Sequence, residues 1–266
     1  MAPDKVAQID TLLDRAVAEH GVHIPLAIES GSRAWGFPSP DSDYDCRFIF
    51  VRTARGHLTP WPQRDVIEFV LHDELDANGW DLAKALRLLL RGNAVIIEWL
   101  SSPVVYRGQD WFRQAFLAFT RQVANRDAIA RHYLHLGERQ RRMYFGDGSA
   151  VAQKKIFYAL RPAAALRWLV MRPGEAVAPM DFPTLMAECD PPSDLRREVA
   201  DLLARKAVTH ELGVAPLSPA VTAFIDQEFN RARAVWDEGR AHATHEQRID
   251  AEAFYRRVVE RLDEGG

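Results

Sequence analysis

The chain has 266 residues, of which 47% are hydrophobic and 27% are charged, and its formal net charge is -3 at pH 7. These values are typical of a folded globular protein with one large domain or two modest ones, and they exclude a disordered chain. The slightly negative charge argues against a protein that coats nucleic acid by bulk charge, so nucleic-acid binding would need a local basic surface.

The cysteines and the apolar runs indicate the compartment. Cys46 and Cys189 are far apart and belong to no CxxC or His/Cys array, which excludes a disulfide framework and a zinc ribbon. Residues 1–21 lack the apolar core of a secretion signal, and no run approaches the roughly 18 apolar residues of a membrane span. The sequence therefore predicts a cytoplasmic protein without membrane contact.

The first 102 residues combine helix patterns with short strand patterns. Apolar residues at helical spacing predict a helix over residues 5–20 that ends at Gly21. Four strand patterns follow, the last of which is a separate strand or a continuation of the third, at residues 22–30, 44–51, 64–71 and 74–77. After Gly79 the pattern changes, and two helices are predicted at residues 80–93 and 94–102.

From about residue 108 the pattern is almost entirely helical. Six long helices, separated by Pro and Gly breaks, are predicted at residues 110–123, 127–145, 149–171, 192–208, 218–238 and 246–263. The predicted fold class is therefore α+β, with a small mixed-sheet domain at residues 1–107 followed by an all-helical domain at residues 108–266.

Two acids open the second predicted strand. Asp43 and Asp45 flank Tyr44, so their side chains should project from the same face of the strand. Neighbouring carboxylates repel, and a divalent cation is the usual resolution, which predicts a magnesium site. Ahead of them, Gly31 permits close backbone approach and Ser32 adds a hydroxyl beside backbone N–H groups, a combination that suits a bound phosphate.

The acidic stretch also has simpler interpretations. An isolated D-x-D is more often an Asp-rich turn whose side chains bond the local backbone. A calcium loop requires Gly and Glu where this chain has Cys46 and Arg52, so the calcium interpretation fails. The phosphate-and-metal hypothesis rests on the combination of a strand, Gly-Ser, a gap of ten residues, a paired-acid strand and a further acid on a later strand.

The block GSRAWGFPSPDSDYDCRFIFV, residues 31–51, resembles the signature of the DNA polymerase β-like nucleotidyltransferase superfamily. Together with residues 79–106 and 153–170, it resembles the predicted nucleotidyltransferases described as RNA-repair-pathway, DNA polymerase β-like proteins. These blocks lie within residues 29–171 and leave the last third of the chain uncovered.

The resemblance implies roles for the acids. Asp43 and Asp45 would be the metal-binding pair, and Gly31 with Ser32 would hold the triphosphate. A third carboxylate is expected on a neighbouring strand. Asp76 is the preferred candidate because it was expected just before a helix, and two further acids, Glu68 and Glu74, compete with it.

The resemblance also implies a reaction. Two Mg²⁺ or Mn²⁺ ions would assist transfer of a nucleoside monophosphate from an NTP, with ATP expected, to an acceptor hydroxyl, with release of pyrophosphate. The family's association with RNA repair points to an RNA 3′ end, of tRNA or cleaved RNA, as the acceptor. Three alternatives stay open: nucleotidylation of a protein, nucleotidylation of a small molecule, and a nucleotide-binding regulator without turnover.

Basic residues supply the expected phosphate contacts. Between residues 131 and 172 there are nine Lys or Arg and two acids, interleaved with aromatic residues, which suits nucleotide or single-stranded RNA binding as well as an ordinary helix surface. Lys154, Tyr158 and Arg161 lie at i, i+4 and i+7, so they share a helix face. With Lys155 they are the candidate NTP contacts on this helix, which Pro162 is expected to bend or interrupt. Near the acids, Arg33 is a further candidate, and Arg47 is close enough in sequence to help.

Overall fold

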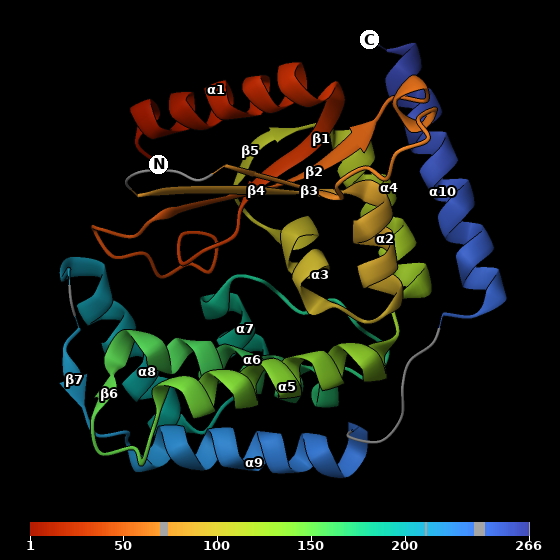
Figure 1. Ribbon diagram of the computed structural model, residues 1–266. Coiled ribbons are helices and arrows are strands. Elements are labelled where there is room, and N and C mark those ends of the chain that lie inside the picture. The colour runs from red at the N-terminus through yellow and green to blue at the C-terminus, as the bar shows by residue number, and fades with distance from the viewer. Residues whose placement is uncertain (70–73, 211, 237–242, 266) are drawn as a thin grey trace.

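The computed structural model describes residues 1–69, 74–210, 212–236 and 243–265. A sheet layer lies above a layer of helices, and the last helix runs along one side of the sheet layer (Figure 1). Among the described residues, no helix is both long enough and apolar enough to cross a membrane.

The sheet has five strands in the order β3-β4-β2-β1-β5. Strand β2 pairs in parallel with β4, whereas the other neighbours are antiparallel. The sheet is therefore mixed, as predicted from the sequence. The five strands span Val22–Glu29 (β1), Tyr44–Arg52 (β2), Val66–Phe69 (β3), Leu75–Asp81 (β4) and Val105–Gly108 (β5).

Alternate residues of β2 pack on opposite faces of the sheet, as the period of a strand requires. Cys46, Phe48 and Phe50 are buried in the same cluster as the apolar residues of α1 (Pro3–His20). Ile49 and Val51 belong instead to the core on the other face. Three helices next to the sheet contribute buried residues to that core, namely α2 (Leu82–Leu90), α3 (Ala94–Ser101) and α4 (Asp110–Val123).

The helical layer is built around three long helices that pack on one another, α5 (Arg126–Tyr144), α6 (Gln153–Met171) and α9 (Pro219–Trp236). Gly137 allows their close approach, because a Cβ there would lie 2.4 Å from Cζ of Phe229 and 3.0 Å from Cβ of Pro162. Helix α6 continues through Pro162, so the interruption expected there does not occur. The layer also contains α7 (Phe182–Glu188), α8 (Ser193–Val208) and a ladder of β6 (Val151–Ala152) with β7 (Val214–Ala215).

The C-terminal helix α10 (His245–Glu264) returns to the sheet layer. The Phe254 ring stacks on that of Phe119 in α4 with centroids 4.9 Å apart, and Oδ2 of Asp263 accepts the backbone N–H of Ala54 at 2.8 Å. The domain division at residue 107 stays a prediction, but α4 and α10 both follow it in sequence and both pack on the sheet layer.

The six long predicted helices and the first three strands are present; the helix at residues 110–123 has the predicted ends, and the predicted ends at residues 70–71 and 237–238 lie outside the described residues. The helix prediction was wrong at residues 80–81, because β4 continues to Asp81. Trp80 and Asp81 pair with Ile49 and Phe50 of β2, and Asp81 then caps α2 by accepting the backbone N–H of Ala83 at 2.8 Å. Five short elements of the described chain were not predicted: β5, β6, β7, α7 and the 3-10 helix at Arg55–His57.

Candidate functional site

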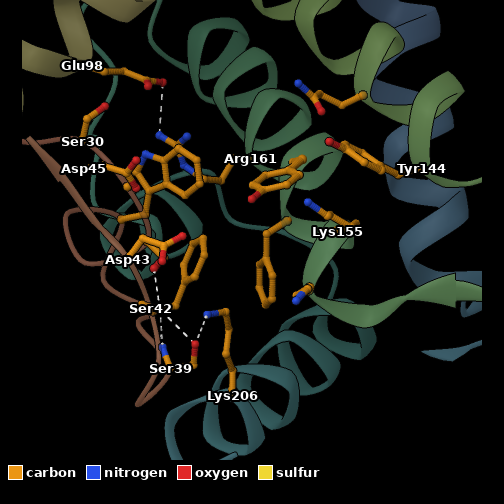
Figure 2. A pocket seen from close by; sticks show the side chains of 18 of the residues that line it. Ser30, Ser39, Ser42, Asp43, Asp45, Glu98, Tyr144, Lys155, Arg161 and Lys206 are labelled. Atoms are coloured by element: carbon orange, nitrogen blue, oxygen red, sulfur yellow. Dashed lines mark hydrogen bonds and ion pairs between the residues drawn. The ribbon is translucent and has the colours of Figure 1, made fainter. Parts of the chain in front are cut away.

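A cavity of about 620 Å³ lies between the sheet layer and the helical layer. Its strand wall consists of the lining residues between positions 30 and 47, on the β1–β2 loop and the start of β2. Its helical wall consists of the lining residues of α3, α5, α6 and α8, together with His210 just after α8. Figure 2 shows Asp43 and Asp45 on the strand wall, with Tyr144 and Lys155 across the cavity from them.

Asp43 and Asp45 both line the cavity, whereas Tyr44 between them is buried beneath α1. The predicted shared face of the two acids is therefore confirmed. Gly31 lies directly against Asp45, since a Cβ at that glycine would be 1.8 Å from Oδ2 of the acid. The site thus requires glycine at position 31 because the carboxylate occupies the space of a side chain.

Asp76 lies beside Asp45 on the neighbouring strand, where β2 and β4 place the two in register. It does not precede a helix, so the reason given for choosing it was wrong, although its position on an adjacent strand fits the expectation. The Arg47 guanidinium bridges the two acids, at 2.6 Å from Oδ2 of Asp76 and 3.4 Å from Oδ1 of Asp45. Glu68 and Glu74 have other partners, Asn78 and Lys5.

Burial raises the pKa of Asp45 above its usual range, and the charges of Asp76 and Asp43 act in the same direction while Arg47 opposes them. The strand wall therefore concentrates negative charge that one arginine offsets only in part. Such a site favours a bound cation.

The carboxylates of the strand wall meet some of the requirements of a Mg²⁺ site. Asp43 and Asp45 offer the carboxylate oxygens that Mg²⁺ prefers. Within the described ranges, however, no group of three or more His, Cys, Asp or Glu side chains is already placed to hold a metal. Asp76 adjoins the pair on β4 but is not among the described residues that line the cavity, and Arg47 holds its Oδ2.

The Gly-Ser turn is tied down by a buried acid that sequence reasoning missed. Glu29, the last residue of β1, is fully buried and accepts the backbone N–H groups of Gly31 at 3.0 Å and Asp45 at 3.1 Å, and the hydroxyl of Tyr106. Burial raises its pKa. The N–H of Gly31 is therefore engaged by Glu29, and what the glycine provides is close approach. The available signal was an acid ending an otherwise apolar strand.

Ser32 lines the cavity, whereas the cavity-lining residues of the described chain do not include Arg33. The Arg33 guanidinium donates to the backbone carbonyls of Ser42 at 2.6 Å and Asp43 at 3.2 Å, and it lies over the Tyr44 ring at 4.0 Å. In this position Arg33 holds the loop that carries the acids.

The four residues singled out on α6 all line the cavity: Lys154, Lys155, Tyr158 and Arg161. Nζ of Lys155 lies 4.5 Å from the ring centroid of Tyr144 and 4.7 Å from that of Tyr158, which places a cation against two aromatic faces. The two tyrosine centroids are 5.8 Å apart. This wall therefore offers stacking surfaces together with positive charge.

Arg161 is already paired within the protein. It is 8% exposed, lies 3.1 Å from Oε1 of Glu98, and covers the Trp35 ring at 4.3 Å. Trp35 belongs to the loop that follows Gly31, and its carbonyl accepts the backbone N–H of Phe182 at 2.8 Å. Arg161 thus fastens the loop of the strand wall to the helical layer.

Acids from elsewhere in the chain balance part of the excess of basic residues counted between positions 131 and 172. Four of these arginines form ion pairs: Arg141 with Asp226, Arg161 with Glu98, Arg167 with Glu228 and Arg172 with Glu188. Arg139, Arg142 and Lys154 are exposed on α5 and α6. The basic surface is consequently smaller than the local count predicts.

Comparison with known proteins gives two matches. The model of the RNA repair pathway DNA polymerase beta family matches residues 6–255, which extends the resemblance through most of the last third of the chain. The chain is 39% identical over 219 residues to the uncharacterized protein YcgL of Bacillus subtilis (strain 168), an alignment that covers 82% of this chain and 83% of that protein. The chain belongs to the RNA repair pathway DNA polymerase beta family.

Proposed function

We propose that this protein is a metal-dependent nucleotidyltransferase that moves a nucleoside monophosphate from an NTP, with ATP expected, to the 3′ hydroxyl of an RNA, with release of pyrophosphate. One observation carries the proposal: Lys155 and Tyr144 lie opposite Asp43 and Asp45 across a cavity of about 620 Å³. That volume is typical of small-molecule sites. Membership of a polymerase β-like family supports the reaction class.

The proposed roles follow the two walls. Asp43 and Asp45 would hold Mg²⁺ or Mn²⁺, with Asp76 as the third acid after Arg47 moves. When bound, the ions neutralise phosphate charge and lower the pKa of the acceptor hydroxyl. Gly31 keeps the backbone close to Asp45.

On the helical wall, Tyr144 and Tyr158 offer faces on which a base can stack, and Lys155 supplies positive charge beside them. Lys154 also lines the cavity and is exposed, so it can meet a phosphate. Arg161 acts indirectly by holding Trp35 and the Gly-Ser loop.

An RNA acceptor is supported by the surface beside the cavity as well as by the family. Arg139 and Arg142 are exposed on α5, and they neighbour Gln140 and Tyr144, which line the cavity. Exposed arginines next to aromatic residues suit a single-stranded RNA whose end enters the site.

The proposal is tested by offering each α-labelled NTP with Mg²⁺ or Mn²⁺ to total RNA, tRNA and soluble protein. Label in RNA 3′ ends with wild type, and none with Asp43→Asn/Asp45→Asn, is the expected result. Label in protein would replace RNA transfer with protein nucleotidylation, and label in a small molecule would identify that acceptor class. NTP binding without labelling of any acceptor would favour the regulator.

A further inference from the structure

The end of the cavity nearest α8 contains a lysine that lies outside the three sequence blocks that resemble the family, although inside the residues 6–255 that the family model matches. Lys206 is only 7% exposed and lines the cavity. Its Nζ donates to Oγ of Ser39 at 3.4 Å and lies 5.5 Å from the ring centroid of Phe37. Lysine is among the residues least often buried, so its position at a cavity wall calls for a functional explanation.

Serine hydroxyls connect this lysine to the acidic pair. Oγ of Ser39 lies 2.9 Å from Oγ of Ser42, which also accepts the hydroxyl of Ser32 at 2.9 Å. Ser42 directly precedes Asp43. Figure 2 shows Ser42, Ser39 and Lys206 in succession beyond Asp43, so a polyphosphate that begins at the acids would pass hydroxyl groups before it meets the lysine.

A second lysine and a histidine lie at the same end. Lys154 and His210 line the cavity, and Nδ1 of His210 lies 3.9 Å from Oδ2 of Asp41 on the rim. The Ser39 hydrogen bond holds the pKa of Asp41 below its usual value, and the charges of His210 and Lys154 act in the same direction. Lys154 and His210 thus act on the exposed carboxylate of Asp41, while Lys206 lies at Ser39, the residue that hydrogen-bonds the same carboxylate. Ammonium groups together with hydroxyls are the donors that bind phosphate oxygens.

Aromatic rings line another part of the cavity. The Trp35 and Tyr158 rings contact edge to face with centroids 6.0 Å apart, and Tyr144 continues the aromatic surface at 5.8 Å from Tyr158. Aromatic faces suit a nucleobase rather than a phosphate. The cavity therefore has an aromatic side, formed by Trp35, Tyr144 and Tyr158, and an end at which Lys206 and Ser39 lie, while Asp43 and Asp45 lie on the strand wall.

We propose that Lys206, with Ser39, binds the terminal phosphate of the nucleoside triphosphate and makes the site select triphosphates over monophosphates. The inference rests on the proposed function, because it assumes that the α-phosphate lies at Asp43 and Asp45. Burial of Lys206 strengthens the contact, since salt screens a buried charge less than an exposed one.

The test measures the affinities of the tri-, di- and monophosphate of the base that binds most tightly, by titration calorimetry with Mg²⁺. Lys206→Met keeps the apolar stem and should weaken triphosphate binding by about 10- to 100-fold, with monophosphate binding changed less than about twofold. Lys206→Arg should restore most of the triphosphate preference, and Ser39→Ala should lose a smaller part of it.

The matched control is Arg205→Met, which removes an exposed positive charge, paired with Asp201, from the adjacent position of α8. It should leave all affinities unchanged. Thermal unfolding of each variant separates loss of binding from loss of fold, and Ser39→Ala provides the second route if Lys206→Met does not fold. Equal weakening of tri- and monophosphate, or an unchanged triphosphate preference, would overturn the proposal.

Two further measurements test whether Lys206 binds the NTP or the acceptor, and whether the protein transfers nucleotide. Oligonucleotides with a 3′ phosphate or a 3′ hydroxyl show whether Lys206 recognises the acceptor, and a Lys206 effect confined to the 3′-phosphorylated strand would overturn assignment to the NTP. Label transfer is measured in parallel. If triphosphate selectivity depends on Lys206 but no label is transferred, the phosphate subsite stands and the proposed function is refuted. If label is transferred but Lys206→Met keeps the wild-type selectivity, the proposed function stands and the subsite is refuted.

Discussion

The strand wall and the helical wall of the cavity are held in different ways. On the strand wall, residues close in sequence position one another, and Glu29 accepts the backbone N–H groups of Gly31 and of Asp45, which is 16 positions away. The helical wall depends on long-range contacts, such as that of Lys206 with Ser39 across 167 positions. The comparison teaches that local sequence places the acids, whereas packing of the two layers places the binding groups.

The largest expected effect concerns the acids of the strand wall. Asp45→Asn should lower the rate of nucleotide transfer roughly 1000-fold or more, because a charged metal ligand is lost. Asp76→Asn should cost about 100-fold, whereas Glu68→Gln and Glu74→Gln should stay within about threefold, since neither acid lies beside Asp45. Steady-state rates with labelled NTP measure all four, with Asp201→Asn on α8 as the exposed control. A larger loss in a glutamate variant would reassign the third ligand.

A pair of glycines sharpens the distinction between site and scaffold. A Cβ at Gly31 would meet the Asp45 carboxylate, whereas a Cβ at Gly79 would lie 2.1 Å from Cε2 of Phe48 in the core. Gly31→Ala should displace Asp45 and lower transfer by roughly 100-fold with little change in Tm, because a side-chain carboxylate can move. Gly79→Ala should destabilise the fold by about 1–3 kcal/mol through overpacking and keep the activity of the folded molecules.

For both glycine variants, Tm and the transfer activity per folded molecule are measured. The account of Gly31 fails if its variant loses stability as Gly79→Ala does while the folded fraction transfers nucleotide at the normal rate.

A buried ion pair joins α6 to α3, and its removal should lower the stability of the fold. Arg161 and Glu98 have side chains 9% and 12% exposed, so Arg161→Met leaves a nearly buried carboxylate and should lower the free energy of unfolding by about 3 kcal/mol. The exposed pair of Arg196 with Asp190 is the control, and Arg196→Met should cost no more than about 1 kcal/mol. Denaturant unfolding compares them. Equal losses in the free energy of unfolding would show that the buried pair contributes no more to stability than the exposed pair.

The smallest predicted effect is a pH dependence at Glu29. Because burial raises its pKa, the folded protein holds more protons than the unfolded chain above the ordinary value of 4.5, so stability falls as pH rises through this range. Glu29→Gln does not titrate, so the wild type should lose stability relative to this variant by at most about 1.4 kcal/mol per pH unit. Urea unfolding from pH 4.5 towards neutrality measures the difference. A constant difference, or one that moves in favour of the wild type, would contradict the assignment.

Much of the strand wall could be predicted from sequence because its motif is local. Gly31, Ser32, Asp43 and Asp45 line or adjoin one cavity, as expected. Arg33 shows where proximity fails: neighbours in a tight turn point in different directions, and this guanidinium turns to the backbone of the loop.

On the helical wall, periodicity placed Lys154, Tyr158 and Arg161 on one face, and all three line the cavity. It could not reveal that Glu98, 63 positions from Arg161, neutralises that arginine. Lys206 was missed for the same reason, since its helix resembles an ordinary amphipathic helix until it packs beside Ser39.

The fold shows a similar limit. Long helices were predicted because many turns carry the apolar pattern, whereas β5 and α7 are too short to have one. The true extent of β4 depends on pairing with β2, a contact that the helix-like residues after Gly79 conceal.

The most direct test of the central claim follows the two ends of the triphosphate. Wild-type protein is incubated with RNA and Mg²⁺ and with an NTP labelled at either the α- or the γ-phosphate. The account predicts that α-label enters the RNA 3′ end while γ-label appears in pyrophosphate. Transfer of γ-label to the acceptor would contradict it, because the site would then be a phosphotransferase.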